Sequence, residues 1–396
     1  MRKFFLILIY LLFIVGSCCG CNEQSHRTKI TFSSWGSKTE TAIIKSLLTK
    51  FERENPDIDV EFIHTPANYF QKLHLLFASN LPPDVLFLNN YYFPQYQHYD
   101  LLEDLTPYFK EEINEGIFFS QALAAFERDG AVYAIPRDVS NVVIYFNKNL
   151  FNKYKLPHPS FDWKYSDMMS LAKSFKSLSQ SPKIYGISFS EKSVFWLPFL
   201  STNVEQKTNL YPYLTQRESV KILQEYADLA NIYGVAPLKK ELSGQTQAQI
   251  FMNGKMAMYV GGRWNLPKFL EIKNFEWNVV PFPYDGQLSL MVPLDASGWA
   301  ISKKSKNKIE ALKLLKFLTS AESIDKFSQS GLIVPARRDI AQSKNFIFAN
   351  PFLEALKRSK PLKFDKESKK ILENFELQLE PAFSGGRSVH ECILEK

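Results

Sequence analysis

The chain has 396 residues and a formal net charge of +7 at pH 7, with 45% hydrophobic and 14% aromatic residues. This length is more than one hydrophobic core usually serves, and it predicts two domains. The positive charge is spread thinly along the sequence, which excludes the concentrated basic surface of a nucleic-acid-binding protein. Beyond residue 21 the sequence has one cysteine, Cys392, so no internal disulfide framework is expected.

The first 17 residues predict an export signal. Arg2 and Lys3 precede an unbroken apolar run of 12 residues, Phe4 to Val15, and small residues follow before Cys18. This order is typical of a cleaved signal peptide. A helix of that length spans only about 18 Å, well short of the ~30 Å hydrocarbon core of a bilayer, so a permanent transmembrane helix is not expected.

The small residues before Cys18 resemble a bacterial lipobox, in which the cysteine is lipidated and becomes the new N-terminus. Cys21 is a poorer match of the same kind, and an ordinary cleaved signal with incidental cysteines is the alternative. Residues 18–28 then predict a polar tether. Such an anchor holds a protein stably at a membrane when it carries more than one acyl chain.

From residue 29 onward, strands and helices alternate, beginning with a strand, a helix and a second strand. The strand at 29–34 is followed by Ser37-Lys38-Thr39-Glu40, a capping-box pattern that predicts a helix start. One face of that helix is apolar, and the helix is expected to end at Asn55-Pro56. The second strand is expected at 59–63. The apolar face carries Ile44, Leu47, Leu48 and Phe51.

The rest of the chain continues this alternation, which predicts largely parallel sheets whose ligands bind beyond the carboxyl ends of strands. Further strands are predicted at 84–88, 130–136, 142–147, 185–189, 256–260, near 278 and at 296–302. Further helices are predicted at 68–79, 166–178, 216–233, 264–271 and along a run marked by Ile309, Leu312, Leu315 and Leu318.

Enzyme and metal motifs are missing from the sequence. G-x-S-x-G and H-E-x-x-H do not occur, and the six histidines lack metal-ligand spacing. A glycoside hydrolase needs two carboxyl groups about 5 to 10 Å apart, and Asp138 and Asp295 are the candidates on facing loops. Isolated loop aspartates more often cap turns, so this surface glycoside hydrolase is kept only as an alternative.

Indole, guanidinium and carboxylate groups are expected on loops next to strands. Aromatic faces pack against the C–H faces of a sugar ring, and charged planar groups hydrogen-bond its hydroxyls. The residue types therefore indicate a carbohydrate site. They are Trp35, Arg137-Asp138, Arg263-Trp264 after Gly261-Gly262, and Asp295 with Trp299.

Several stretches resemble the family 1 extracellular solute-binding proteins, which feed ATP-binding-cassette sugar importers and include the maltodextrin-binding proteins. The resemblance covers nearly the whole chain after the predicted signal. Its most specific stretches are ITFSSWGSKTETAIIKSLLTKFERENPDIDVEF, PPDVLFL, GAVYAIPRDVSNVVIYFNKNLF, FMNGKMAMYVGGRWN and SGWAISKKSKNKIEALKLLKFLTS, followed by the turn Pro335-Ala336-Arg337.

The resemblance implies an α/β, two-lobed periplasmic-binding-protein fold of type II, like that of maltose-binding protein, with a hinge between discontinuous lobes. The N-terminal lobe is expected to comprise 29–137 and 298–338. The C-terminal lobe is expected to comprise 138–297 and 339–396. The ligand is then enclosed in the cleft between the lobes.

The resemblance also assigns ligand-binding residues. Asn89 and Asn90 stand where sugar binders of the family often carry an acidic or aromatic residue, which leaves the identity of the sugar open. The residues implied are Trp35, Tyr69, Asn89 and Asn90 in the first lobe, Arg263 and Trp264 in the second, Arg137, Asp138 and Asp295 near the hinge, and Trp299 and Arg337 on the return of the chain.

The implied function is that of a non-enzymatic, monomeric, extracytoplasmic lipoprotein, anchored through Cys18, that captures a sugar or oligosaccharide and delivers it to the membrane permease subunits of an importer. No cofactor, metal or nucleic acid is implied. Arg137, Arg263 and Arg337 together also suit a phosphate, so a glycerol-phosphate type of ligand is an alternative within the family. A further alternative, outside this transport function, is an adhesin or sensor lipoprotein that binds a partner protein.

Overall fold

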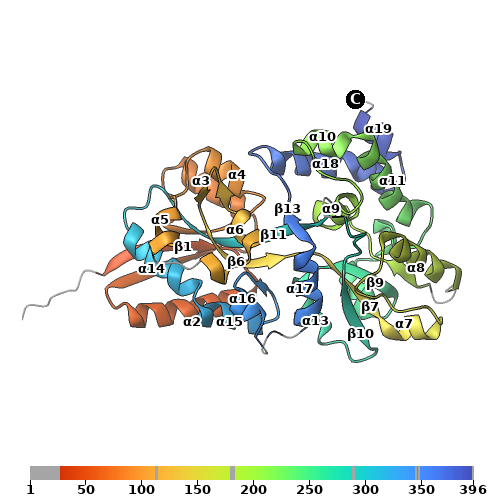
Figure 1. Ribbon diagram of the computed structural model, residues 1–396, viewed down its shortest axis with the longest axis horizontal. Helices are drawn as coiled ribbons and strands as arrows, with labels where there is room; N and C mark the ends of the chain where they lie inside the picture. Colours follow the sequence, from red (N-terminus) through yellow and green to blue (C-terminus); the bar gives the residue numbers. More distant parts are fainter. Residues whose placement is uncertain are drawn as a thin grey trace, which may run out of the picture.

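The computed structural model describes residues 27–111, 115–178, 183–287, 290–343, 346 and 348–394. The predicted signal segment, Cys18 and nearly all of the predicted tether lie outside these residues. Figure 1 shows two halves side by side along the long axis of the molecule, joined in the middle by strands. Within the described ranges, no helix has both the length and the apolar character needed to cross a membrane.

The larger sheet lies mainly in one half and has seven strands, of which β13 and the start of β11 lie at the junction with the other half (Figure 1). They are β1 (Thr28–Ser34), β2 (Ile58–His64), β3 (Val85–Asn89), β6 (Ile135–Ser140), β11 (Val292–Ile301), β12 (Val334–Pro335) and β13 (Ser359–Pro361). Their order is β12-β6-β11-β3-β1-β2, with β13 paired to β11. β1 runs parallel to β2 and β3, whereas β11 runs antiparallel to β3 and β6.

The smaller sheet belongs to the other half and has the order β10-β7-β9-β8. Its strands are β7 (Val143–Asn147), β8 (Tyr185–Ile187), β9 (Met256–Gly261) and β10 (Trp277–Pro281). Successive residues of β7 face different cores, because side chains alternate along a strand. Val143 and Tyr145 join the hydrophobic cluster that extends to the larger sheet, whereas Ile144 and Phe146 join a second cluster. A separate two-stranded ladder pairs β4 (Glu127–Arg128) with β5 (Ala131–Val132).

Helices cover the larger sheet, with α3 and α4 above it and α2 and α15 below it in Figure 1. The predicted capping box at the start of α2 is confirmed, since Ser37 accepts from the N–H of Glu40 and Glu40 accepts from the N–H of Ser37. The helices of this half are α2 (Lys38–Glu54), α3 (Tyr69–Ala78), α4 (Phe93–His98), α5 (Thr106–Glu111), η1 (Glu115–Ile117), α6 (Ser120–Ala124), α14 (Lys308–Leu318), α15 (Ala321–Gln329) and α16 (Arg338–Ala341).

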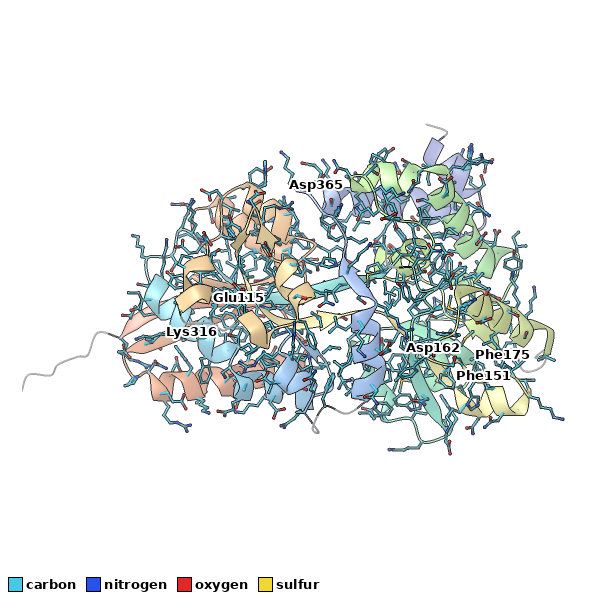
Figure 2. The ribbon with its side chains drawn as sticks, viewed as in Figure 1. Glu115, Phe151, Asp162, Phe175, Lys316 and Asp365 are labelled. Carbon is cyan, nitrogen blue, oxygen red and sulfur yellow. The ribbon has the colours of Figure 1, made fainter. Side chains whose placement is uncertain are left out.

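The other half is mainly helical around its small sheet. Phe151 and Phe175 meet inside it, with ring centroids 5.0 Å apart (Figure 2). Its helices are α7 (Lys148–Lys153), α8 (Tyr165–Leu178), α9 (Ser193–Ser201), α10 (Leu210–Thr215), α11 (Arg217–Asn231), η2 (Lys239–Glu241), α12 (Gln247–Met252), η3 (Arg263–Asn265), α13 (Leu266–Phe269), α17 (Ala349–Lys357), α18 (Ser368–Phe383) and α19 (Val389–Leu394).

Two expectations about the sheets are wrong. Both sheets are mixed and not largely parallel, because β11 returns antiparallel between β3 and β6, and β7 is antiparallel to both of its neighbours. Arg137 and Asp138 lie inside β6, and Asp295 lies inside β11, instead of on loops, whereas Trp299 lies in the strand predicted at 296–302. The reason is that β6 lies further along the chain than predicted, at Ile135–Ser140, and that β11 begins four residues earlier than predicted, at Val292, so both strands continue through the junction of the two halves.

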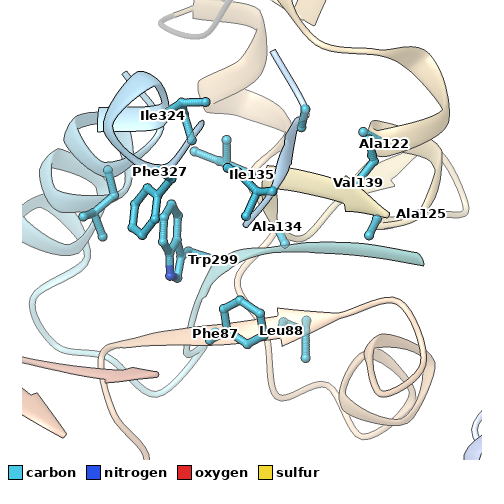
Figure 3. Packing of buried hydrophobic residues seen from close by; sticks show 14 of the residues in the cluster. Phe87, Leu88, Ala122, Ala125, Ala134, Ile135, Val139, Trp299, Ile324 and Phe327 are labelled. Atoms are coloured by element: carbon cyan, nitrogen blue, oxygen red, sulfur yellow. The ribbon is translucent and has the colours of Figure 1, made fainter. Parts of the chain in front are cut away.

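Trp299 is part of the core of the larger sheet. It is fully buried, and its ring centroid lies 5.9 Å from that of Phe327 and 6.3 Å from that of Phe32. Figure 3 shows the indole beside Phe327, with Phe87 of β3 nearby. In this structure Trp299 therefore supports the sheet and does not present a surface to a ligand.

Candidate functional site

A hollow lies where the two halves meet, and we call it the junction hollow. Its cavity volume is about 10 Å³, which is room for one water-sized group. Aromatic rings, a carboxylate and an amide share this space. Its lining residues are Tyr91, Ser140, Asn141, Val142, Val194, Leu197, Pro198, Trp264, Pro293 and Asp295.

Trp264 gives the junction hollow an exposed indole. The residue is 37% exposed, and its ring packs against the main chain at Gly262, where an added Cβ would lie 1.9 Å from indole Cζ3. The backbone of Gly262 is extended, with φ −107° and ψ −176°, a conformation open to any residue. Glycine is therefore needed here to make room for the indole and not to satisfy the backbone.

Trp35 is the exposed indole of the other half, at 38% exposure directly after β1. Its ring is supported by Phe87 and Phe70, with centroids 5.2 and 6.0 Å away. Tyr69 lies buried beside it, with its hydroxyl 3.0 Å from the carbonyl oxygen of Ser33 and accepting from the N–H of Phe87. Burial raises the pKa of Tyr69. Tyr69 thus supports Trp35 from within the core.

Arg137 is a buried cation shared by two carboxylates. Its guanidinium pairs with Asp138 and lies 3.5 Å from Glu40, and three aromatic rings surround it with centroids 5.1 to 5.6 Å away. Burial acts to lower the pKa of Arg137, but the two carboxylates reverse this and raise it. Burial raises the pKa of Asp138 against the opposing effect of Arg137. Arg137 therefore links α2 to β6 and is already neutralised.

Asp295 brings to the junction hollow a carboxylate with one oxygen that lacks a partner. Its Oδ1 is buried and has no hydrogen-bond partner within the described ranges. Burial, and then the charge of Asp138, raise the pKa of Asp295 from 3.8 to about 7. The carboxyl group is therefore only partly ionised near neutral pH.

We expect Asp295→Asn to stabilise the fold above pH 7. The folded chain keeps this proton up to about pH 7, whereas the unfolded chain releases it near 3.8. The folded state therefore binds more protons in this window, and stability falls as the pH rises through it. A shift of this size corresponds to at most about 4 kcal/mol. Melting temperatures of the wild type and the variant, measured from below pH 4 to above pH 7, check this prediction. The prediction is contradicted if the two melting temperatures depend on pH in the same way.

Asn89 and Asn90 hold the chain around the junction hollow. The side chain of Asn90 donates to the main chain before Asp295 and accepts from the main chain after it, both at 3.1 Å. Asn89 accepts from the N–H of Tyr92 at 3.1 Å. Both amides are used within the protein, and between them they fix the positions of Asp295 and Tyr91.

Arg263 is buried away from the junction hollow. It is 1% exposed, and its guanidinium carbon lies 4.0 Å from the ring centroid of Phe346 and 4.9 Å from that of Phe352. Its three side-chain nitrogens have no hydrogen-bond partner among the residues that the structure describes. Burial lowers the pKa of Arg263 to about 10. Arg263 thus fastens the turn that carries Trp264 to α17 and its preceding segment.

Arg337 also has partners inside the protein. Its Nη2 lies 2.7 Å from Oδ2 of Asp339, and Nη1 donates to the carbonyl oxygen of Thr319 at 3.1 Å. The three arginines proposed for a phosphate thus sit in three separate environments, and none of them lines the junction hollow.

Sequence reasoning missed part of this lining. Ser140 and Asn141 lie in the short connection between two predicted strands, and Tyr91 follows the predicted site residues directly. The segment α9 was not predicted, because it is apolar around its whole circumference and shows no helical period. Glu40 has a clear capping signal, but nothing in the sequence indicates its contact with Arg137.

A family model described as "Bacterial extracellular solute-binding protein" matches residues 46–353. A similar protein is the Multiple sugar-binding protein of Streptococcus mutans. It is 25% identical over 361 residues, and the match covers 82% of this chain and 80% of that protein.

Two solved structures are similar over both halves. The ABC substrate-binding protein Lmo0181 from Listeria monocytogenes, in complex with cycloalternan, has a TM-score of 0.81 at 26% identity, covering 93% of this chain and 97% of that one. The maltose-bound MalE3 of T. maritima has a TM-score of 0.78 at 23% identity, covering 92% and 97%. The similarity thus includes the junction of the halves.

Proposed function

We propose that this chain, which belongs to the bacterial extracellular solute-binding proteins, captures a sugar or oligosaccharide between its two halves and delivers it to the permease of an ATP-binding-cassette importer. Its fold is the α/β periplasmic-binding-protein fold predicted from the sequence. A solute-binding receptor carries out no reaction, so Asp138 and Asp295 have no catalytic role.

The observation that carries the proposal is a pair of exposed indoles, one in each half. Trp35 and Trp264 each pack against protein on one side and stay more than a third exposed. A sugar ring stacks on such a surface through its C–H groups. Hydrogen bonds to a charged group such as Asp295 contribute roughly 1.5–3 kcal/mol each and aromatic contacts roughly 0.5–1.5, so a few reach the ~8 kcal/mol of micromolar binding.

The two halves act as lobes with the boundaries expected from the sequence, 29–137 with 298–338 and 138–297 with 339–396. The contacts between them include a hydrogen bond of 3.0 Å between Lys366 and His98, beside Asp365 at the inner edge of the second half (Figure 2). A ligand that touches both lobes favours the closed arrangement, because it shifts the equilibrium by its differential affinity.

A lipid anchor at Cys18 and a tether over 18–28 complete the proposal. Support comes from the order of charged, apolar and small residues at the N-terminus and from membership in an extracellular family. An anchored receptor stays within reach of the permease to which it delivers its ligand. A glycerol-phosphate type of ligand is not favoured, because the three arginines lie apart.

Thermal unfolding of the purified chain with a panel of saccharides of increasing length tests the proposal. A ligand at 100 times its Kd stabilises the folded state by about 2.7 kcal/mol, which gives a measurable rise in melting temperature. The proposal fails if no saccharide raises the melting temperature.

We expect Gly262→Ala to weaken saccharide binding about tenfold, as much as the loss of a good aromatic contact. The added methyl group occupies the place of the Trp264 ring, so the indole has to leave its position. Calorimetric titration measures the change. In a Trp264→Ala background the same substitution is expected to have no further effect, and an additional tenfold loss there would refute this explanation.

A further inference from the structure

Two hydrogen-bond acceptors at the junction hollow have no donor. Oδ1 of Asp295 and Oδ1 of Asn141 are both buried, and neither has a hydrogen-bond partner in the part of the chain that the structure describes. Both residues line the junction hollow, and Asn141 is 4% exposed. Buried polar atoms are normally paired, so this pair of acceptors indicates a ligand group that donates.

The orientation of the Asn141 amide follows from its neighbours. Its Nδ2 lies 3.3 Å from the hydroxyl of Ser359, and that hydroxyl donates to the carbonyl oxygen of Ala355 at 2.7 Å. A serine hydroxyl has one hydrogen, so it can only accept from Asn141. The NH₂ group must face Ser359, and the amide oxygen is left for the junction hollow.

The charges around Asp295 are not balanced. Asp138 and Glu40 share one cation, Arg137. Lys369 acts on Asp295 from a distance, but it forms its own ion pair with Glu373 at 3.2 Å. A buried carboxylate without a counter-ion is unfavourable, which the raised pKa of Asp295 reflects. A positive charge in the junction hollow would balance the negative charge of Asp295.

The aromatic residues that line the junction hollow also favour a positively charged group. Tyr91 and Trp264 both line the junction hollow, and the faces of such rings attract a cation within about 6 Å. A carboxylate, an amide oxygen and two aromatic rings are together the features that bind an ammonium group.

We propose that the junction hollow binds a protonated amino group of the ligand, so that this receptor prefers amino sugars to neutral sugars. The inference rests on the proposed saccharide-binding function. The ammonium group donates to Asp295 and Asn141, beside the rings of Tyr91 and Trp264. A neutral hydroxyl in the same place donates one hydrogen bond and leaves the charge of Asp295 uncompensated.

Calorimetric titration with matched probes tests this. Glucosamine is compared with glucose, and the β-linked glucosamine disaccharide with cellobiose, at neutral pH. Each pair differs in amino groups that replace hydroxyls. The amino sugar of at least one pair is expected to bind tenfold or more tightly than its neutral partner, and equal affinities in both pairs overturn the inference.

Variants separate this inference from the proposed function. Asp295→Asn is expected to abolish the preference for the amine, because the affinity for the amino sugar falls more than that for the neutral sugar. Exposed Asp285→Asn is expected to leave the preference unchanged. Asn141→Ala is expected to reduce the same preference. A preference that survives Asp295→Asn overturns the inference, whereas binding of neutral sugars alone overturns it and leaves the proposed function standing. If neither class of sugar binds, both fail.

Discussion

Replacing both Trp35 and Trp264 with alanine is expected to weaken saccharide binding about a hundredfold. Each indole offers an exposed face from a different half, and an aromatic contact of up to ~1.5 kcal/mol corresponds to about a factor of ten. The two losses should add, because the residues sit in separate environments. Calorimetric titration of the single and double variants measures them.

A matched control is Phe161→Ala, which removes a ring of similar exposure, 36%, that does not line the junction hollow. We expect it to leave affinity unchanged. Trp264→Ala should also leave the melting temperature of the ligand-free protein close to that of wild type. If Trp264→Ala unfolds the chain instead, the indole belongs to the core and not to a ligand surface.

Arg137→Met is expected to lower the free energy of unfolding by about 3–5 kcal/mol, the cost of removing one partner of a buried ion pair. The substitution leaves Asp138 and Glu40 without their cation in a buried environment. Denaturation by urea measures the loss. Asp138→Asn in the Arg137→Met background should recover part of it, because one unpaired charge is then removed.

The control is Arg337→Met, which breaks a pair whose carboxylate, on Asp339, is 47% exposed. An exposed pair of this kind contributes about 0–1 kcal/mol. If Arg137→Met costs no more than this control and lowers ligand affinity instead, Arg137 is a ligand contact, as the sequence alone predicts.

The local signals in the sequence predict much of the fold. The helix start at Ser37 follows from side-chain and main-chain hydrogen bonds within four residues, and α8 and α11 follow from their apolar faces. The direction of β11 cannot be predicted from local signals, because it depends on pairing with β3 and β6, which lie far away in the sequence. Pairing between distant strands leaves no periodic spacing of apolar residues in the local sequence.

The site is predicted less completely, for a reason visible in β6. The register between β6 and β11 shifts at Ser297 and Gly298, so that Asp138 and Pro136 face consecutive residues and Arg137 is the extra residue of a bulge. Neighbouring side chains on a regular strand point to opposite faces, and a bulge re-aims them. The bulge is consistent with the ion pair between Arg137 and Asp138, which no spacing rule predicts.

The burial of the tryptophan side chains also could not be predicted from the sequence. Trp35, Trp264 and Trp299 all look like site residues beside strands, yet two are exposed and the third is fully buried. Their different burial depends on what packs over each ring, Phe327 and Phe32 in the case of Trp299. Sequence can select the residue type but not the tertiary contacts that cover it.

A crystal structure of the chain with the saccharide that most raises its melting temperature tests the central claim most directly. We expect a sugar ring stacked on Trp264, a second contact with Trp35, and a ligand atom within hydrogen-bond distance of Asp295. A saccharide bound to one half only, or away from the junction hollow, would contradict the account.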